Sequence, residues 1–236
     1  MENPWKEITE SRLVLPEDQN RISDFNNRCQ NENCKIQIDL IPDPFFGNKD
    51  AKVVLLMLNP GFGGNEKCNY ATKNFKKVLL NNLKQTNTKR HFFSLDKAFV
   101  GTDAYNYWKP RVKELNNNGM QNDELSEKLF CINLFPYHSR SYKKLPGGLL
   151  ESQKYSLFLL DNAIKDANTI VVSMRSYRLW EQAYKEIYED GESFDNLLEI
   201  GKMIKVKNYR NPTLSTANLG DNNFNIVLNK LKGSFI

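Results

Sequence analysis

Long apolar runs are missing from this sequence, and none approaches the roughly 20 residues that a membrane-spanning helix needs. The N-terminus, MENPWKEITE, is polar and acidic and has no basic start followed by an apolar stretch, so no secretory signal is expected. The chain also has no internal repeat and no low-complexity linker. We therefore expect no transmembrane helix, and we expect a cytoplasmic protein.

Cysteine is scarce as well, with four in 236 residues. Cys131 lies in an apolar run, where a reduced and packed thiol is the ordinary outcome. Cys29 and Cys34 can donate to a metal, but a four-ligand site needs two more ligands, and Cys68 with a distant histidine is a poor second pair. We therefore expect free thiols, with neither a disulfide nor a metal site.

The charge balance is mildly basic, with a formal net charge of +5 and an isoelectric point near 8.9. This balance fits a polyanionic partner without requiring one. The basic segment HSRSYKK, residues 138–144, directly follows an apolar run. On composition alone it is a solvated loop.

Four short apolar runs predict buried strands: VVLLML at 53–58, LFCINL at 129–134, TIVVSM at 169–174 and MIKVK at 203–207. The first three lack polar alternation, as parallel strands covered on both faces do. The fourth alternates, which is typical of a strand near an edge.

Helical patterns lie between and around these runs, and their apolar residues recur at the spacing of one helix face. They are found at residues 18–27, 75–83 behind Thr72 as N-cap, 155–163, 179–187 and 224–231 behind Asp221 as N-cap. Strands alternating with helices imply right-handed crossovers. The sequence thus predicts an α/β fold, a three-layer α/β/α sandwich with a central, mainly parallel four-stranded sheet.

One domain is expected to fill residues 1–236. It would carry an N-terminal extension over residues 1–45. An irregular insertion over about residues 85–122 would contain a helix and a turn near Asn118-Gly119.

Asparagine-centred turns follow three of the four predicted strands. The first strand ends in Asn59-Pro60-Gly61, the second runs through Asn133, and the fourth precedes the segment YRNPTLST with Asn211. Taken alone, Asn59 would cap its turn, Asn133 would satisfy a strand edge, and Asn211 would begin an Asx turn that opens a loop. In open α/β sheets, however, ligands bind where the carboxyl ends of strands converge. Three such residues at converging ends predict one polar site.

These motifs resemble those of the uracil-DNA glycosylase superfamily, in its mismatch-specific and single-strand-selective branches. LLMLNPG looks like the first motif, a strand ending in an Asn-Pro-Gly turn, and FCINLFPY is similar to the second-strand motif of the single-strand-selective branch. NPTLS resembles the last motif, an Asn-Pro-Ser or His-Pro-Ser turn followed by a leucine wedge. The resemblance covers roughly Pro42 to the C-terminus, apart from residues 85–122.

The resemblance implies a monofunctional DNA glycosylase of base excision repair, which hydrolyses the N-glycosidic bond of uracil or a related damaged pyrimidine. DNA would be the partner, no cofactor would be needed, and a monomer is expected. Asn59 would hold the attacking water, and Asn211 would donate to the leaving base. Asn133 would read uracil by donating to its O4 and accepting from its N3–H.

Further roles are implied for side chains near these motifs. Tyr70 would stack on the base, with Phe62 and Phe46 as rivals, although ordinary core packing suits Phe46 better. His138 would donate to the base or to a phosphate, or it is a surface histidine.

DNA contacts are implied at two segments. Thr213 would bind a phosphate and Leu214 would be the wedge, although the chain lacks an extra residue between them that some branches have. Arg140 and Lys143 of the basic segment would contact the DNA backbone.

Two other interpretations stay open. A catalytically weak or inactive nucleic-acid or nucleotide-binding module on the same fold is suggested by asparagine at both Asn59 and Asn211. An unrelated small-molecule enzyme would use His138 as general base near the glycine-rich stretch PGFGGN, which lacks the lysine of a P-loop.

Overall fold

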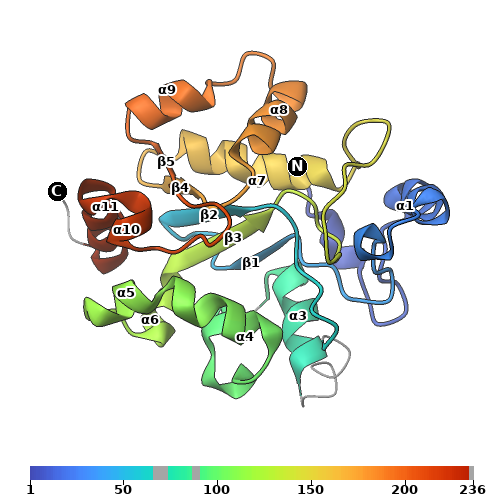
Figure 1. Ribbon diagram of the computed structural model, residues 1–236, viewed down its shortest axis with the longest axis horizontal. Coiled ribbons are helices and arrows are strands. Elements are labelled where there is room, and N and C mark those ends of the chain that lie inside the picture. The colour runs from blue at the N-terminus through green and yellow to red at the C-terminus, as the bar shows by residue number, and fades with distance from the viewer. Residues whose placement is uncertain (66–73, 87–90, 234–236) are drawn as a thin grey trace.

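The four predicted strands pair side by side in one sheet, and a fifth strand joins them at one edge (Figure 1). The computed structural model describes residues 1–65, 74–86 and 91–233. The sheet order is β1-β3-β2-β4-β5. The strands are β1 Phe45–Gly47, β2 Val53–Met57, β3 Leu129–Asn133, β4 Ile170–Ser173 and β5 Met203–Lys205. The predicted α/β class is confirmed, but the sheet has five strands instead of four.

The central strands are buried on both faces, as their unbroken apolar runs predict. β2 pairs in parallel with β3 on one side and with β4 on the other, and every residue of these three strands is buried. β5 is parallel to β4 at the edge, and its Lys205 is exposed, in keeping with its alternating sequence. β1 runs antiparallel to β3, so the sheet is mixed.

β1 is the strand that the sequence did not predict. It has only three residues, and Phe45 pairs with Ile132 of β3. Its last residue, Gly47, has a φ of +102°, and a Cβ there would lie 2.3 Å from the Leu129 carbonyl oxygen. The buried Asn82 side chain donates to the Phe45 carbonyl oxygen at 2.6 Å. A run this short, between a proline and a glycine, has too few residues to show a pattern.

Helices lie on both faces of the sheet. Figure 1 shows α7, α8 and α9 on one side and α3 to α6 on the other, with α10 and α11 at the left of the view. The helices are α1 Pro16–Arg28, α3 Phe75–Lys84, α4 Asp103–Trp108, α5 Lys113–Asn117, α6 Asn122–Lys128, α7 Gln153–Lys165, α8 Tyr177–Ile187, α9 Phe194–Glu199, α10 Thr216–Leu219 and α11 Asp221–Lys232. Short 3-10 helices are η1 Pro4–Glu7, η2 Glu32–Cys34, η3 Phe93–Leu95, η4 Lys97–Phe99 and η5 Lys109–Arg111.

The five predicted helical patterns correspond to α1, α3, α7, α8 and α11. Gly220 is the N-cap of α11, and Asp221 is its first helical residue, which corrects the predicted cap. Thr72 lies outside the described residues. None of the helices in the described ranges is long and apolar enough to cross a membrane.

The N-terminal extension packs into the same core as the sheet. Trp5 and Ile8 are fully buried and belong to one hydrophobic cluster that extends to Leu231 in α11. The Tyr137 hydroxyl donates to the buried Asp18 carboxylate of α1 at 2.7 Å. These contacts join α1 to the loop after β3.

The insertion contains the short helices η3, η4, α4, η5 and α5, and Figure 1 shows α4 and α5 below the sheet. Its aromatic side chains pack edge-on against the sheet: the Phe46 ring lies 4.6 Å from Phe92 and 5.6 Å from Trp108, measured between centroids. The predicted turn is present, with Gly119 at a φ of +94°. Aromatic packing thus orders a segment whose sequence has little periodicity.

Candidate functional site

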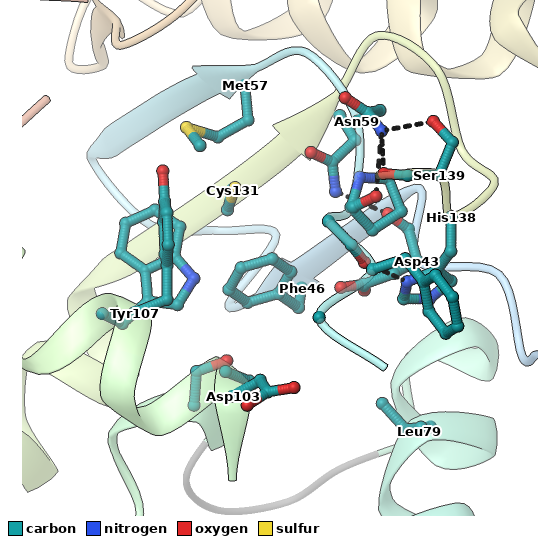
Figure 2. Close-up of a pocket in the computed structure, with 18 of the residues that line it drawn as sticks. Asp43, Phe46, Met57, Asn59, Leu79, Asp103, Tyr107, Cys131, His138 and Ser139 are labelled. Carbon is teal, nitrogen blue, oxygen red and sulfur yellow. Dashed lines mark hydrogen bonds between the residues drawn. The ribbon is translucent and has the colours of Figure 1, made fainter. Parts of the chain in front are cut away.

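A cavity of about 340 Å³ opens at the carboxyl ends of the central strands (Figure 2). The chain after β2 enters the layer of α3, whereas the chain after β3 and β4 enters the layer of α7 and α8 (Figure 1). Loops that diverge in this way leave a crevice at the sheet edge, which is where ligands bind in open α/β proteins. The volume lies at the small end of the range for ligand pockets, roughly 300–1,000 Å³.

Asn59 and Asn133 both line this cavity. Asn133 ends β3 opposite Met57 of β2, and Asn59 follows Met57 by two residues, so the parallel register brings the two side chains to one edge. The site therefore unites two of the three asparagines predicted to meet there.

The Asn59 carboxamide is held by the chain around it. Its Nδ2 donates to the Pro60 carbonyl oxygen at 2.9 Å and to the Ser139 hydroxyl at 3.1 Å (Figure 2). Because the nitrogen is engaged in this way, the orientation of the amide is fixed. The carboxamide oxygen is then the atom that can accept a hydrogen bond from a ligand or a water.

Asn133 is buried, and its Nδ2 donates to the Asp43 carbonyl oxygen at 2.6 Å. An amide nitrogen carries two hydrogens, so one N–H remains, together with the carbonyl oxygen of the side chain. This bond also connects the end of β3 to the segment that leads into β1. Asn133 therefore keeps a donor and an acceptor for the predicted contact with a base, and that contact stays a prediction.

Asp43 is a cavity carboxylate that no motif of the sequence indicated. Its Oδ1 is buried and has no hydrogen-bond partner among the described residues. Burial raises the pKa of Asp43 to about 7. A carboxyl group with that pKa can exchange a proton near neutral pH, as a general base or acid must.

His138 joins two walls of the cavity. Its Nδ1 lies 2.8 Å from the Gly61 carbonyl oxygen and its Nε2 lies 3.1 Å from the Ile41 carbonyl oxygen. Carbonyl oxygens only accept, so each contact is a hydrogen bond when that ring nitrogen carries a hydrogen, and the tautomer decides which of the two is formed. His138 thus braces the Asn59 loop, and the general-base role considered for it would need these contacts to break.

The aromatic residues predicted for base stacking differ in position. Phe46 and Phe62 both line the cavity, Phe46 as a buried residue of β1 and Phe62 half-buried under Arg140. The Arg140 guanidinium carbon lies 5.4 Å from the Phe62 ring centroid. Phe46 therefore belongs to the cavity wall as well as to the core. Tyr70 lies outside the described residues.

The last motif does not reach the cavity. The Asn211 side chain is exposed and is not among the residues that line it. β5 is separated from β2 by β4, and adjacent strands lie about 4.8 Å apart, so the loop after β5 starts from a strand about 10 Å away from β2. The structure thus does not bring Asn211 together with Asn59 and Asn133.

The expected DNA-contacting residues of the last motif are held by the protein itself. The Thr213 hydroxyl and the Asn218 Nδ2 lie 2.7 Å apart. Leu214 is fully buried, so in this conformation it is a core residue and not an exposed wedge. Arg140 lines the cavity, whereas Lys143 is exposed and is not among the residues that line it.

The cavity is also lined by three residues that no motif of the sequence indicated, namely Asp103, Tyr107 and Arg175. In Figure 2, Tyr107 lies across the cavity from Asn59 and His138, with Asp103 below them. Arg175 directly follows an apolar run, which is the signal that identified Asn59, but no motif surrounds it. Asp103 and Tyr107 belong to α4, whose place depends on tertiary packing.

Within the described ranges, no group of three or more histidine, cysteine, aspartate or glutamate side chains is placed to hold a metal. Cys29, Cys34 and Cys131 are buried free thiols, and Cys68 lies outside the described residues.

Comparison of the chain with protein-family models, with curated proteins and with solved structures gives no match.

Proposed function

We propose that the protein is a DNA glycosylase that hydrolyses the N-glycosidic bond of uracil or a related damaged pyrimidine. One observation carries the proposal: Asn59 and Asn133 line one aromatic-walled cavity together with the carboxylate of Asp43. A pyrimidine presents a flat ring with alternating donors and acceptors, which such a cavity can stack and read.

The proposal includes the finer fold assignment. We infer that β2 to β5 with their helices form a uracil-DNA glycosylase-like core, to which β1 adds an edge strand. The order of the motifs along the chain supports this, as does the place of the first two motifs at the ends of β2 and β3. DNA as partner and a monomeric, cytoplasmic protein belong to the same proposal.

In the proposed reaction, Asn59 and Asp43 act on the attacking water. The Asn59 carboxamide oxygen accepts a hydrogen bond from the water and orients it toward C1′ of the sugar. The water oxygen bonds to C1′ as the C1′–N bond breaks, and the electron pair of that bond leaves with the base. Asp43 in its ionised form takes the proton from the water. This gives the site the base that an asparagine cannot supply.

Recognition of the leaving base is assigned to Asn133. Its remaining N–H donates to O4 of uracil, and its Oδ1 accepts from N3–H. Cytosine presents the opposite pattern at these two positions, so it would leave buried polar atoms unpaired. The same N–H stabilises negative charge that develops on the base in the transition state.

A base-release assay tests this function. Purified protein is incubated with single-stranded and duplex oligonucleotides that contain uracil or one of a panel of damaged pyrimidines, and free base is quantified. We expect uracil or a close analogue to be released and cytosine to be retained. If every lesion remains in the strand, the glycosylase proposal is wrong.

The alternative, an inactive binding module, is favoured by the position of Asn211 outside the cavity. It predicts binding of the same oligonucleotides that weakens steeply with salt, without release of any base.

A further inference from the structure

Two arginines lie close together at one side of the cavity, Arg175 as a lining residue and Arg111 near it, close enough for the positive charge of Arg175 to lower the pKa of Arg111. Arg175 follows β4 and lines the cavity, and its backbone N–H donates to the Leu56 carbonyl oxygen of β2 at 3.1 Å. The next residue, Ser176, has a φ of +59°, a left-handed conformation that is uncommon for non-glycine residues and is often found at functional sites. The chain therefore leaves the extended conformation of β4 next to Arg175, which lines the cavity.

Arg111 is held beside it by Tyr107. Its guanidinium carbon lies 3.2 Å from the Tyr107 ring centroid, and Nη1 donates to the Tyr107 carbonyl oxygen. The pKa of Arg111 is lowered, mainly by burial and in part by the positive charge of Arg175. Two like charges thus share one half-buried region.

The polar atoms of this region are incompletely satisfied. The Nε atoms of Arg111 and Arg175 and the hydroxyl of Tyr107 are buried without a hydrogen-bond partner in the part of the chain that the structure describes. In that same part, neither arginine forms an ion pair with a carboxylate. Buried donors and unpaired charges without partners are costly, and a bound anion would satisfy both.

We propose that Arg111 and Arg175, with the Tyr107 hydroxyl, bind a phosphate group of the nucleotide whose base enters the cavity. The proposal rests on the proposed function and narrows its substrate to a phosphorylated nucleoside. Guanidinium groups match phosphate oxygens with paired N–H donors, and two of them balance the charge of a phosphate better than one.

The loop after β5 supports this placement. Leu214 donates its backbone N–H to the Arg111 carbonyl oxygen at 2.8 Å, and the Arg210 carbonyl oxygen accepts from Arg175 Nη2 at 3.3 Å. The segment that resembles the last glycosylase motif is therefore braced against both arginines. The phosphate contact expected of Thr213 is assigned instead to the arginine pair.

Binding measurements test the site with four probes: inorganic phosphate, deoxyuridine, deoxyuridine 5′-monophosphate and a uracil-containing single strand. The variants are Arg111→Gln and Arg175→Gln. Arg210→Gln is the matched control, because it removes an exposed charge from the same region but keeps the backbone carbonyl that holds Arg175. Thermal melting checks that each variant is folded.

We expect the wild type to bind a phosphate-bearing probe about 10- to 100-fold more tightly than deoxyuridine. This gain should disappear in Arg111→Gln and Arg175→Gln and persist in Arg210→Gln. A gain for the monophosphate indicates that a free nucleotide can enter, whereas a gain confined to the strand indicates a phosphodiester. No gain in the wild type, or an equal loss in Arg210→Gln, overturns the proposal.

The two proposals fail separately. Arginine-dependent binding of inorganic phosphate without any base release keeps the phosphate site and removes the glycosylase. Base release that is unchanged in Arg111→Gln and Arg175→Gln keeps the glycosylase and removes the phosphate site.

Discussion

Asp43 is placed where ionisation is unfavourable, inside an aromatic-walled cavity and with one carboxylate oxygen unpartnered among the described residues. Burial raises its pKa to about 7 from an ordinary value of 3.8. As pH rises from about 4 to about 7, the unfolded chain loses this proton while the folded chain keeps it. Stability is therefore lost across that window, by at most about 4 kcal/mol in total.

Substitution of Asp43 by asparagine tests both its ionisation and its proposed role. The wild type should lose unfolding free energy as pH rises from 5 to 8, whereas Asp43→Asn should not. The difference in unfolding free energy, variant minus wild type, should therefore increase by about 2–3 kcal/mol over this range. Wild-type kcat/KM for base release should rise with pH and level off above about 7, and the variant should lose this activity at every pH. Urea unfolding and single-turnover rates over this range provide the measurements.

Asp24→Asn, an exposed change on α1, is the control and should alter neither quantity. A pH–rate profile unchanged in Asp43→Asn would exclude Asp43 as the base.

The individual elements show why part of the site was predictable. Asn59 and Asn133 lie at the ends of short, unbroken apolar runs, and parallel pairing of those runs places both at one edge of the sheet. Asp43 precedes a three-residue strand whose position depends on pairing with β3, and Tyr107 lies on α4, which packs through Trp108 against Phe46 and Phe92. Neither position follows from local sequence. The prediction that Asn211 joins this site was wrong, because the motifs do not reveal the strand order, in which β4 separates β5 from β2.

Gly47 is the residue on which the edge strand depends. Gly47→Ala should destabilise the protein strongly, because the added Cβ would lie 2.3 Å from the Leu129 carbonyl oxygen. Gly101→Ala is the matched control, since Gly101 also has a positive φ, +92°, but a Cβ added there would have no described atom within 4 Å. Backbone strain should lower the unfolding free energy of both variants by about 1–2 kcal/mol. Gly47→Ala should lose at least about 2 kcal/mol more unfolding free energy because of the close contact.

Urea unfolding of both glycine variants measures this difference. Equal losses would mean that the close approach of β1 to β3 contributes little to stability.

In the whole molecule, the strands and helices of the sheet could be predicted from the sequence, whereas the cavity could be predicted only in part. The α/β class, the four apolar strands and the five helices follow from apolar periodicity, which burial on both faces of a sheet imposes. The cavity depends on contacts between distant segments, such as His138 with Ile41 and Asn133 with Asp43. A single domain over the full chain stays a prediction, although one hydrophobic cluster runs from Trp5 to Leu231.

Release of uracil in single turnover by the wild type, Asn59→Ala and Asn211→Ala tests the central claim most directly. The two asparagines come from motifs of equal standing in the sequence, but only Asn59 lines the cavity. We predict that the wild type releases uracil, that Asn59→Ala slows release by about 100-fold or more, and that Asn211→Ala stays within about 3-fold of wild type. No release by the wild type, or equal loss in the two variants, would contradict the assignment of this cavity as the site of base excision.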